Sequence, residues 1–352
     1  MSAQRISRRR MIAGLAPVFG AAAAAKLTNV GGNLTAAPAA AVAEAGGAPG
    51  RRSEHAVAGH GFQPGRKVDH AANGFDPSEI VRDFERGRTR TLPSGRVLRE
   101  WEIVAEDKEI EVAPGVKFAA WTYNGRVPGP TLRAREGERL RIKFINGSEH
   151  PHTIHFHGIH PAAMDGIDEK FGGGSVETGK SFTYEFDADP FGLHLYHCHT
   201  SPLAAHIHKG LYGAFIIDPK KGRPEADELV MVMNGFDTNF DASNEVYAVN
   251  TVGFHYQDKP IKVKRGELVR IYLANLLEFD QINSFHTHAN FFQYYPTGTS
   301  LEPTEFTDTI MQAQGQRGIL EMRFPFAGKF MFHAHKTEFA ELGWLGFFEV
   351  ED

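Results

Sequence analysis

Residues 137–158 read GERLRIKFINGSEHPHTIHFHG, and residues 266–289 read GELVRIYLANLLEFDQINSFHTHA. Both stretches begin with Gly-Glu-x-Leu/Val-Arg-Ile and lead into a His-x-His pair. Each half of the chain then reaches a second His-x-His pair and a glycine-containing apolar run: LYHCHT and GLYGAFII in the first half, FMFHAHK and LGWLGFFEV in the second. A repeat of this length takes precedence over local assignments and indicates a duplicated architecture.

Short apolar runs surround both copies of the repeat. They are rich in β-branched and aromatic residues, and glycine, proline and asparagine separate them, which is typical of the strands of a sandwich. We therefore expect an all-β protein with two β-sandwich domains, residues 96–219 and residues 220–352. Residues 46–95 are expected to form a flexible linker or N-terminal extension, and a short helix starting near Pro77 is an open alternative for part of it.

Residues 1–45 have the pattern of a targeting signal followed by an alanine-rich remnant. Three consecutive arginines, Arg8 to Arg10, precede a weakly apolar run that is too short to span a bilayer. Paired arginines before such a run resemble a twin-arginine export signal. We expect the protein to be exported to the periplasm or the extracellular space, without a membrane anchor.

The composition limits the classes of partner and of stabilising bond. The formal net charge is −5, so we expect neither nucleic acid nor an anionic membrane as a partner. The chain has one cysteine, Cys198, which excludes an internal disulfide framework. The unusual residue is histidine, with 18 copies, many of them in His-x-His pairs.

The alternation of side chains along a strand separates the histidines of the first half into two groups. In residues 152–158, HTIHFHG, the last two histidines share one face and the first lies on the other. In residues 196–200, YHCHT, the two histidines share a face and Cys198 points away from them. If these strands are neighbours, one face carries four histidines and the other carries His152 and Cys198. The sequence thus predicts two metal sites joined by one short peptide.

A set of two imidazoles and one thiolate suits copper of the blue type. The second imidazole should come from the loop after Cys198, where His206 and His208 are both candidates. We favour His206, because its spacing to Gly210 places Leu211 where an axial ligand would otherwise lie. Leucine cannot coordinate a metal, so we expect a stabilised cuprous form and a raised reduction potential.

The second half keeps the histidine pairs and loses the residues of the cysteine site. Ala334 stands where Cys198 stands, Asn283 stands where His152 stands, and no histidine follows His335. Four histidines remain, so the two halves together offer eight, the number that a three-copper cluster uses. The eight are His155, His157, His197, His199, His286, His288, His333 and His335.

These motifs resemble those of the two-domain multicopper oxidases, the laccase-like small blue oxidases, in the subgroup with type 1 copper in the first cupredoxin domain. The resemblance covers roughly residues 96–352 and implies two Greek-key cupredoxin domains and four copper ions per chain. It implies type 1 copper at His152, Cys198 and His206 with Leu211 axial, type 2 copper at His155 and His286, and a type 3 pair at His157, His197, His199, His288, His333 and His335. The family forms homotrimers, so each three-copper cluster is expected between subunits.

The resemblance also implies an activity. A phenol, an aromatic amine or another small reducing substrate would deliver electrons to type 1 copper, through an exposed edge of His206, and dioxygen would be reduced to water at the cluster. Asp165 resembles an acidic residue that the family places near type 2 copper, where it would relay protons. The alternative for Asp165 is a turn before Gly166. His160 could also lie near the cluster, whereas His70 and His255 are expected to be incidental or structural.

Copper-containing nitrite reductase is the alternative enzyme. That family resembles this chain in its trimer and first-domain type 1 site, but carries aspartate where this chain has His155 and typically methionine where it has Leu211. It also needs only one histidine beside the cysteine. A plain electron carrier would need the type 1 ligands alone and would leave His288, His333 and His335 without a task.

Overall fold

The structure is a computed structural model, and it describes residues 66–167 and 174–352. The predicted signal, residues 1–45, and the first part of the predicted linker lie outside the described residues. Most of the regular elements in these ranges are strands, which form two groups of two sheets. The all-β class with two sandwiches is therefore confirmed.

The first group of sheets contains β1 to β9. One sheet has the order β1-β2-β5-β7, with β3 also paired to β2, and the other has the order β4-β9-β8-β6. The strands are β1 (Arg88–Thr91), β2 (Val97–Ala113), β3 (Val116–Tyr123), β4 (Leu132–Arg135), β5 (Arg139–Asn146), β6 (His155–Phe156), β7 (Ser181–Asp187), β8 (Gly192–His197) and β9 (Tyr212–Asp218).

The second group contains β10 to β20. Its sheets have the orders β11-β10-β13-β18-β15-β16 and β12-β20-β19-β14-β17. The strands are β10 (Asp227–Phe236), β11 (Val246–Val249), β12 (Ile261–Lys264), β13 (Val269–Asn275), β14 (Ile282–Thr287), β15 (Phe292–Pro296), β16 (Glu305–Thr307), β17 (Thr309–Ala313), β18 (Arg317–Met322), β19 (Gly328–His333) and β20 (Leu345–Glu351).

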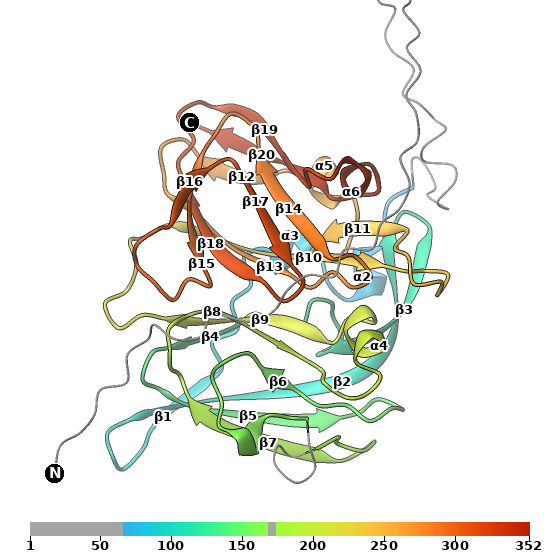
Figure 1. Cartoon of the computed structure of the whole chain (residues 1–352), viewed down its shortest axis with the longest axis vertical. Coiled ribbons are helices and arrows are strands. Elements are labelled where there is room, and N and C mark those ends of the chain that lie inside the picture. The colour runs from blue at the N-terminus through green and yellow to red at the C-terminus, as the bar shows by residue number, and fades with distance from the viewer. Residues whose placement is uncertain (1–65, 168–173) are drawn as a thin grey trace, which may run out of the picture. The chain divides into compact units, whose positions relative to one another are not determined.

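The duplication is visible in the strand pairing. β2 pairs with β5 in parallel and β10 pairs with β13 in parallel. β8 runs antiparallel beside β9, and β19 runs antiparallel beside β20 (Figure 1). His155 pairs with His197 across β6 and β8, just as His286 pairs with His333 across β14 and β19. Both halves therefore bring their two His-x-His segments into contact by the same pairing.

Short helices connect the strands. They are α2 (His70–Asn73), α3 (Pro77–Ile80), α4 (Leu203–His208), α5 (His255–Asp258) and α6 (Thr337–Glu341), with a 3₁₀ turn at Ala162–Met164. No helix in the described ranges is long and apolar enough to cross a membrane.

Residues 66–95 are folded, whereas the sequence predicted a flexible extension for them. They contain α2, α3 and β1, and Phe75, Ile80 and Val81 are buried in the core. A helix does begin at Pro77, because the Asp76 side chain accepts the Ser78 backbone N–H and proline suits the first helical position. Burial of these three apolar side chains holds the segment against the sheets.

Candidate metal centres

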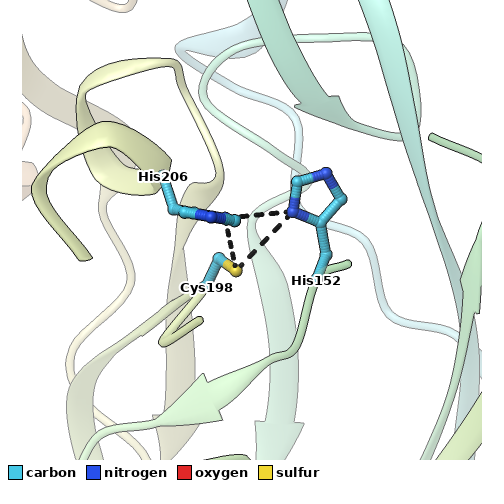
Figure 2. Close-up of side chains that lie close together, drawn as sticks. All are labelled: His152, Cys198 and His206. Atoms are coloured by element: carbon cyan, nitrogen blue, oxygen red, sulfur yellow. Dashed lines mark hydrogen bonds between the residues drawn. The ribbon is translucent and has the colours of Figure 1, made fainter. Parts of the chain in front are cut away.

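One centre forms around the cysteine from three buried side chains (Figure 2). Cys198 follows β8 directly, His206 lies on α4, and His152 lies just before β6. The Cys198 Sγ atom is 3.2 Å from His206 Nδ1 and 3.8 Å from His152 Nδ1, and the two Nδ1 atoms are 3.1 Å apart. One sulfur and two ring nitrogens thus converge on one point.

Neighbouring groups orient these donors. The Nε2 atom of His152 lies 2.9 Å from the hydroxyl of Ser148, which leaves Nδ1 facing the cysteine. The Thr153 backbone N–H donates to the sulfur at 3.3 Å. Burial lowers the pKa of His152 to about 3 and that of His206 to about 4, so both imidazoles are neutral at pH 7. Burial also raises the pKa of the Cys198 thiol, and a bound metal ion would favour loss of its proton.

Of the two loop histidines, the structure brings His206 to the cysteine. The Nε2 atom of His208 instead accepts the Asp237 backbone N–H at 3.0 Å. Leu211 is fully buried in the same core cluster as Cys198, and its carbonyl accepts the Cys198 N–H at 2.9 Å. The leucine therefore lies beside the three donors and offers no ligand atom from its side chain.

The prediction that an edge of His206 is exposed to substrate is wrong, because the residue is only 3% exposed. Trp121 on β3 covers the centre instead, with ring centroids 4.8 Å from His206 and 5.0 Å from His152. The His150 ring also packs against this indole, with centroids 4.8 Å apart. No local pattern in the sequence predicts the place of Trp121, because strand β3 is distant in sequence from all three donors.

Four histidines form a first quartet on the opposite face of the same segment. The Nε2 atoms of His157 and His197 are 2.8 Å apart. The His155 ring contacts His199 at 5.3 Å and His197 at 5.4 Å between centroids. The Nδ1 atom of His197 bonds to the Cys198 carbonyl at 2.9 Å, which directs its Nε2 into the quartet.

The second half repeats this arrangement in a second quartet. The Nε2 atoms of His288 and His333 are 3.1 Å apart, and His333 Nδ1 bonds to the Ala334 carbonyl at 2.7 Å. The His286 ring contacts His335 at 5.2 Å. His288 and His335 are exposed. Among the described residues, no ring contact joins the two quartets.

Asp165 lies at the edge of the first quartet. Its Oδ1 is 2.9 Å from His155 Nδ1 and 3.4 Å from His160 Nε2. Its carbonyl also lies 3.0 Å from His155 Nδ1. In the second quartet the carbonyl of Asp308 makes the corresponding contact with His286 Nδ1 at 3.0 Å. Asp165 also ends the 3₁₀ turn before Gly166, whose φ of +74° is left-handed.

The chemistry of these donors fits copper. A thiolate with two imidazoles suits a blue-copper ion, and sets of imidazoles alone suit copper in its other protein sites. Hydrogen bonds from the outer ring nitrogens to carbonyl or carboxylate oxygens are the usual partners of metal-binding histidines. Both quartets have such carbonyl partners, and in the cysteine centre the outer nitrogen of His152 has the Ser148 hydroxyl as its partner.

Comparisons with known proteins agree with this chemistry. Family models described as multicopper oxidase match residues 104–222 and residues 223–352. A solved structure of a multicopper oxidase is 67% identical and has a TM-score of 0.79, over 81% of this chain and 100% of that one. The copper-containing nitrite reductase of Neisseria gonorrhoeae is 32% identical over 70% of this chain and 66% of its own length. Laccase-9 of Arabidopsis thaliana is 40% identical over 35% of this chain and 21% of its own.

Proposed function

Because this chain belongs to the multicopper oxidase family, we propose that it is a laccase-like oxidase. It would take electrons singly from a phenol, an aromatic amine or another small reducing substrate. It would use four electrons and four protons to reduce one dioxygen molecule to two molecules of water. The observation that carries this proposal is the presence of two histidine quartets in addition to the cysteine centre, since an electron carrier needs the cysteine centre alone.

The assignment of these residues to copper sites follows from the resemblance to the family. His152, Cys198 and His206 would hold type 1 copper, with Leu211 as a non-coordinating axial neighbour. His155 and His286 would hold type 2 copper, and the type 3 pair would be held by His157, His197, His199, His288, His333 and His335. Copper supplies one-electron redox exchange at the first site and dioxygen reduction at the cluster. Four ions per chain would fill these sites.

The backbone around Cys198 gives the two kinds of site a short connection. His197 and His199 are covalent neighbours of the cysteine and point to the opposite face. The His197 Nδ1 bond to the Cys198 carbonyl adds a second link at 2.9 Å. Trp121 shields the cysteine centre from water, and its half-buried ring offers the substrate an aromatic surface next to His206.

Asp165 is the proposed proton-relay residue. Its Oδ1 atom lies within reach of both His155 and His160, where it can hold a proton close to the quartet. The nearby His160 gives the same carboxylate oxygen a second partner, and its ring packs against His155 with centroids 5.1 Å apart. Dioxygen reduction consumes protons, and a carboxyl group at this position could deliver them.

We also propose a homotrimer in which the first quartet of one subunit meets the second quartet of its neighbour. The exposure of His288 and His335 supports this arrangement. The test is to co-express His157→Ala with His288→Ala. Each variant alone should be inactive, and mixed trimers should recover part of the activity, because some of their interfaces join two intact quartets. A cluster within one chain would give no recovery.

The N-terminal Arg8–Arg10 motif supports export through a twin-arginine route, as a proposal. A fusion of residues 1–45 to a reporter that functions only after export would test it, with both Arg9 and Arg10 changed to lysine as the control.

Copper-containing nitrite reductase is the second candidate, and the Neisseria gonorrhoeae relative favours it. The deciding experiment compares two electron acceptors on the copper-loaded protein. We expect oxygen uptake with an aromatic reductant and little nitrite reduction under anaerobic conditions. Nitrite turnover with negligible oxygen uptake would make the protein a nitrite reductase.

A further inference from the structure

A further group of side chains that could hold a metal ion lies outside the cysteine centre and the quartets. It consists of His70 on α2, Asp76 before α3, and His255 on α5. One ring nitrogen from each histidine and one carboxylate oxygen lie within 4.8 Å of one another. About 180 residues separate the two ends of this group in the sequence. Tertiary packing of the N-terminal segment against the second half brings them together.

The donors are held by neighbours but are not fully satisfied. His255 is buried, with Nε2 2.7 Å from Ser78 Oγ and 3.3 Å from Asp76 Oδ1. The His70 ring meets the His255 ring edge-on, with centroids 5.0 Å apart. The Nδ1 atom of His70 is buried and has no hydrogen-bond partner among the described residues. A buried polar atom without a partner is unusual in a folded protein and calls for an explanation.

The protonation states suit a cation. Burial lowers the pKa of His255 to about 4 and also lowers that of His70. Burial pushes the pKa of Asp76 upward, but the Ser78 backbone N–H and the Lys259 ammonium outweigh it, and the result is about 2. At pH 7 the group therefore presents two neutral imidazoles and one carboxylate.

A neighbouring cavity and a neighbouring lysine both affect how a metal ion could bind to this group. A cavity of about 170 Å³ reaches His70 and His255. This is enough room for an ion and a water ligand. The Nζ atom of Lys259 lies 3.0 Å from the other oxygen of Asp76, Oδ2, and competes for the carboxylate. Asp258 lines the same cavity but does not belong to the three-residue group.

We propose that His70, Asp76 and His255 bind a divalent transition-metal ion, zinc in the first instance, that fastens the α2–α3 segment to α5. Two imidazoles and one carboxylate with water in the fourth position form a familiar four-coordinate zinc set. The ion would supply the missing partner of His70 Nδ1. Its role would be structural, since the group contains none of the proposed copper ligands.

The test uses the copper-loaded protein dialysed against Zn²⁺, with zinc and copper both counted by mass spectrometry. Wild type should retain one more zinc per chain than Asp76→Asn, with copper content unchanged. Asparagine caps helices as well as aspartate does, so Asp76→Asn keeps α3 and removes only the charge. The matched control Asp258→Asn should retain zinc like wild type. Equal zinc in wild type and Asp76→Asn, or zinc gained only as copper is lost, would overturn the proposal.

A second variant tests the proposal through an expected gain in zinc affinity. Lys259→Met removes the cation that competes for Asp76 and should tighten zinc binding by about tenfold or more, as measured by competition with a chelator. Zinc should also raise the thermal midpoint of wild type and of Lys259→Met, but not that of Asp76→Asn. Unchanged or weaker affinity in folded Lys259→Met would contradict the assigned ligands.

Discussion

Cys198 connects two faces of one segment. Its sulfur points to His152 and His206, while its covalent neighbours His197 and His199 belong to the first quartet. The Sγ atom accepts the Thr153 N–H, and burial keeps the site dry. A change at this residue should therefore affect the cysteine centre and spare the quartets.

Cys198→Ser tests that separation. Serine preserves the size of the side chain but is a poor ligand for copper, so the intense blue absorption and the oxidation of substrate should disappear. Most of the copper should remain, since the quartets keep all their imidazoles. Absorption spectra and metal analysis on the same sample check this. A variant that stayed blue would show that type 1 copper lies elsewhere.

The faces of these side chains could be predicted from the sequence, because alternation along a strand is fixed by backbone geometry. The spacing from His206 to Gly210 favours His206 over His208 as the second imidazole, and the structure brings His206 to Cys198. Trp121 and the group around His70 could not be predicted. Their contacts depend on how distant segments pack, which no local pattern encodes.

At the scale of elements, the turn from α4 into β9 positions the cysteine centre. Gly210 has a φ of +114°, and an added Cβ would lie 2.5 Å from Val127 Cγ2 and 2.9 Å from the Trp121 carbonyl oxygen. Glycine is thus required there for both conformation and space. The turn places His206 on one side and Leu211 on the other.

Gly210→Ala should therefore destabilise the protein and weaken the cysteine centre. Gly222→Ala is the matched control, because Gly222 also has a positive φ, +74°, but nothing within 4 Å of the added Cβ. The crowding at Gly210 should cost about 1–3 kcal/mol beyond the control. Chemical denaturation measures the difference, and loss of blue colour reports the centre. Equal costs for the two variants would contradict a packing role for Gly210.

Sequence patterns also predicted the duplicated strands, since the repeat has the same His-x-His spacing in both halves. They did not predict that residues 66–95 fold onto the core. The capping residue Asp76 and the apolar pair Ile80–Val81 are present in the sequence, but each helix there has only four residues. Such short helices are held by packing rather than by helix propensity.

At the scale of the whole molecule, a charge network joins the two groups of sheets. Arg133 on β4 binds Asp218 at 2.8 Å and Glu228 on β10 at 2.6 Å. Arg270 on β13 binds Glu228 at 3.1 Å and Glu321 at 2.6 Å. Because Glu228 has both arginines as partners, its replacement should lower the stability of the protein more than that of any other residue in this network.

Glu228→Gln should cost about 1.5–3 kcal/mol of unfolding free energy at pH 7. Burial raises the pKa of Glu228, but its arginine and tyrosine partners outweigh that and hold it at about 2, below its ordinary value of 4.5. Its folded pKa is depressed, so its contribution is present above about pH 4.5 and is lost as pH falls toward 2.

The difference between wild type and Glu228→Gln should accordingly shrink over that pH range, as followed by urea denaturation. The exposed Glu225→Gln is the control and should show no such trend. A difference that stayed constant down to pH 2.5 would show that the charge of Glu228 does not stabilise the fold.

The most direct test of the central claim is the copper content per chain of the fully loaded protein, measured in the Asp76→Asn background so that the proposed site at His70, Asp76 and His255 does not contribute. We expect about four copper ions per chain, because the cysteine centre and the two quartets supply one type 1 site and one three-copper cluster. About two ions per chain would contradict the cluster, leave the histidine quartets without a task, and make nitrite the acceptor to test next.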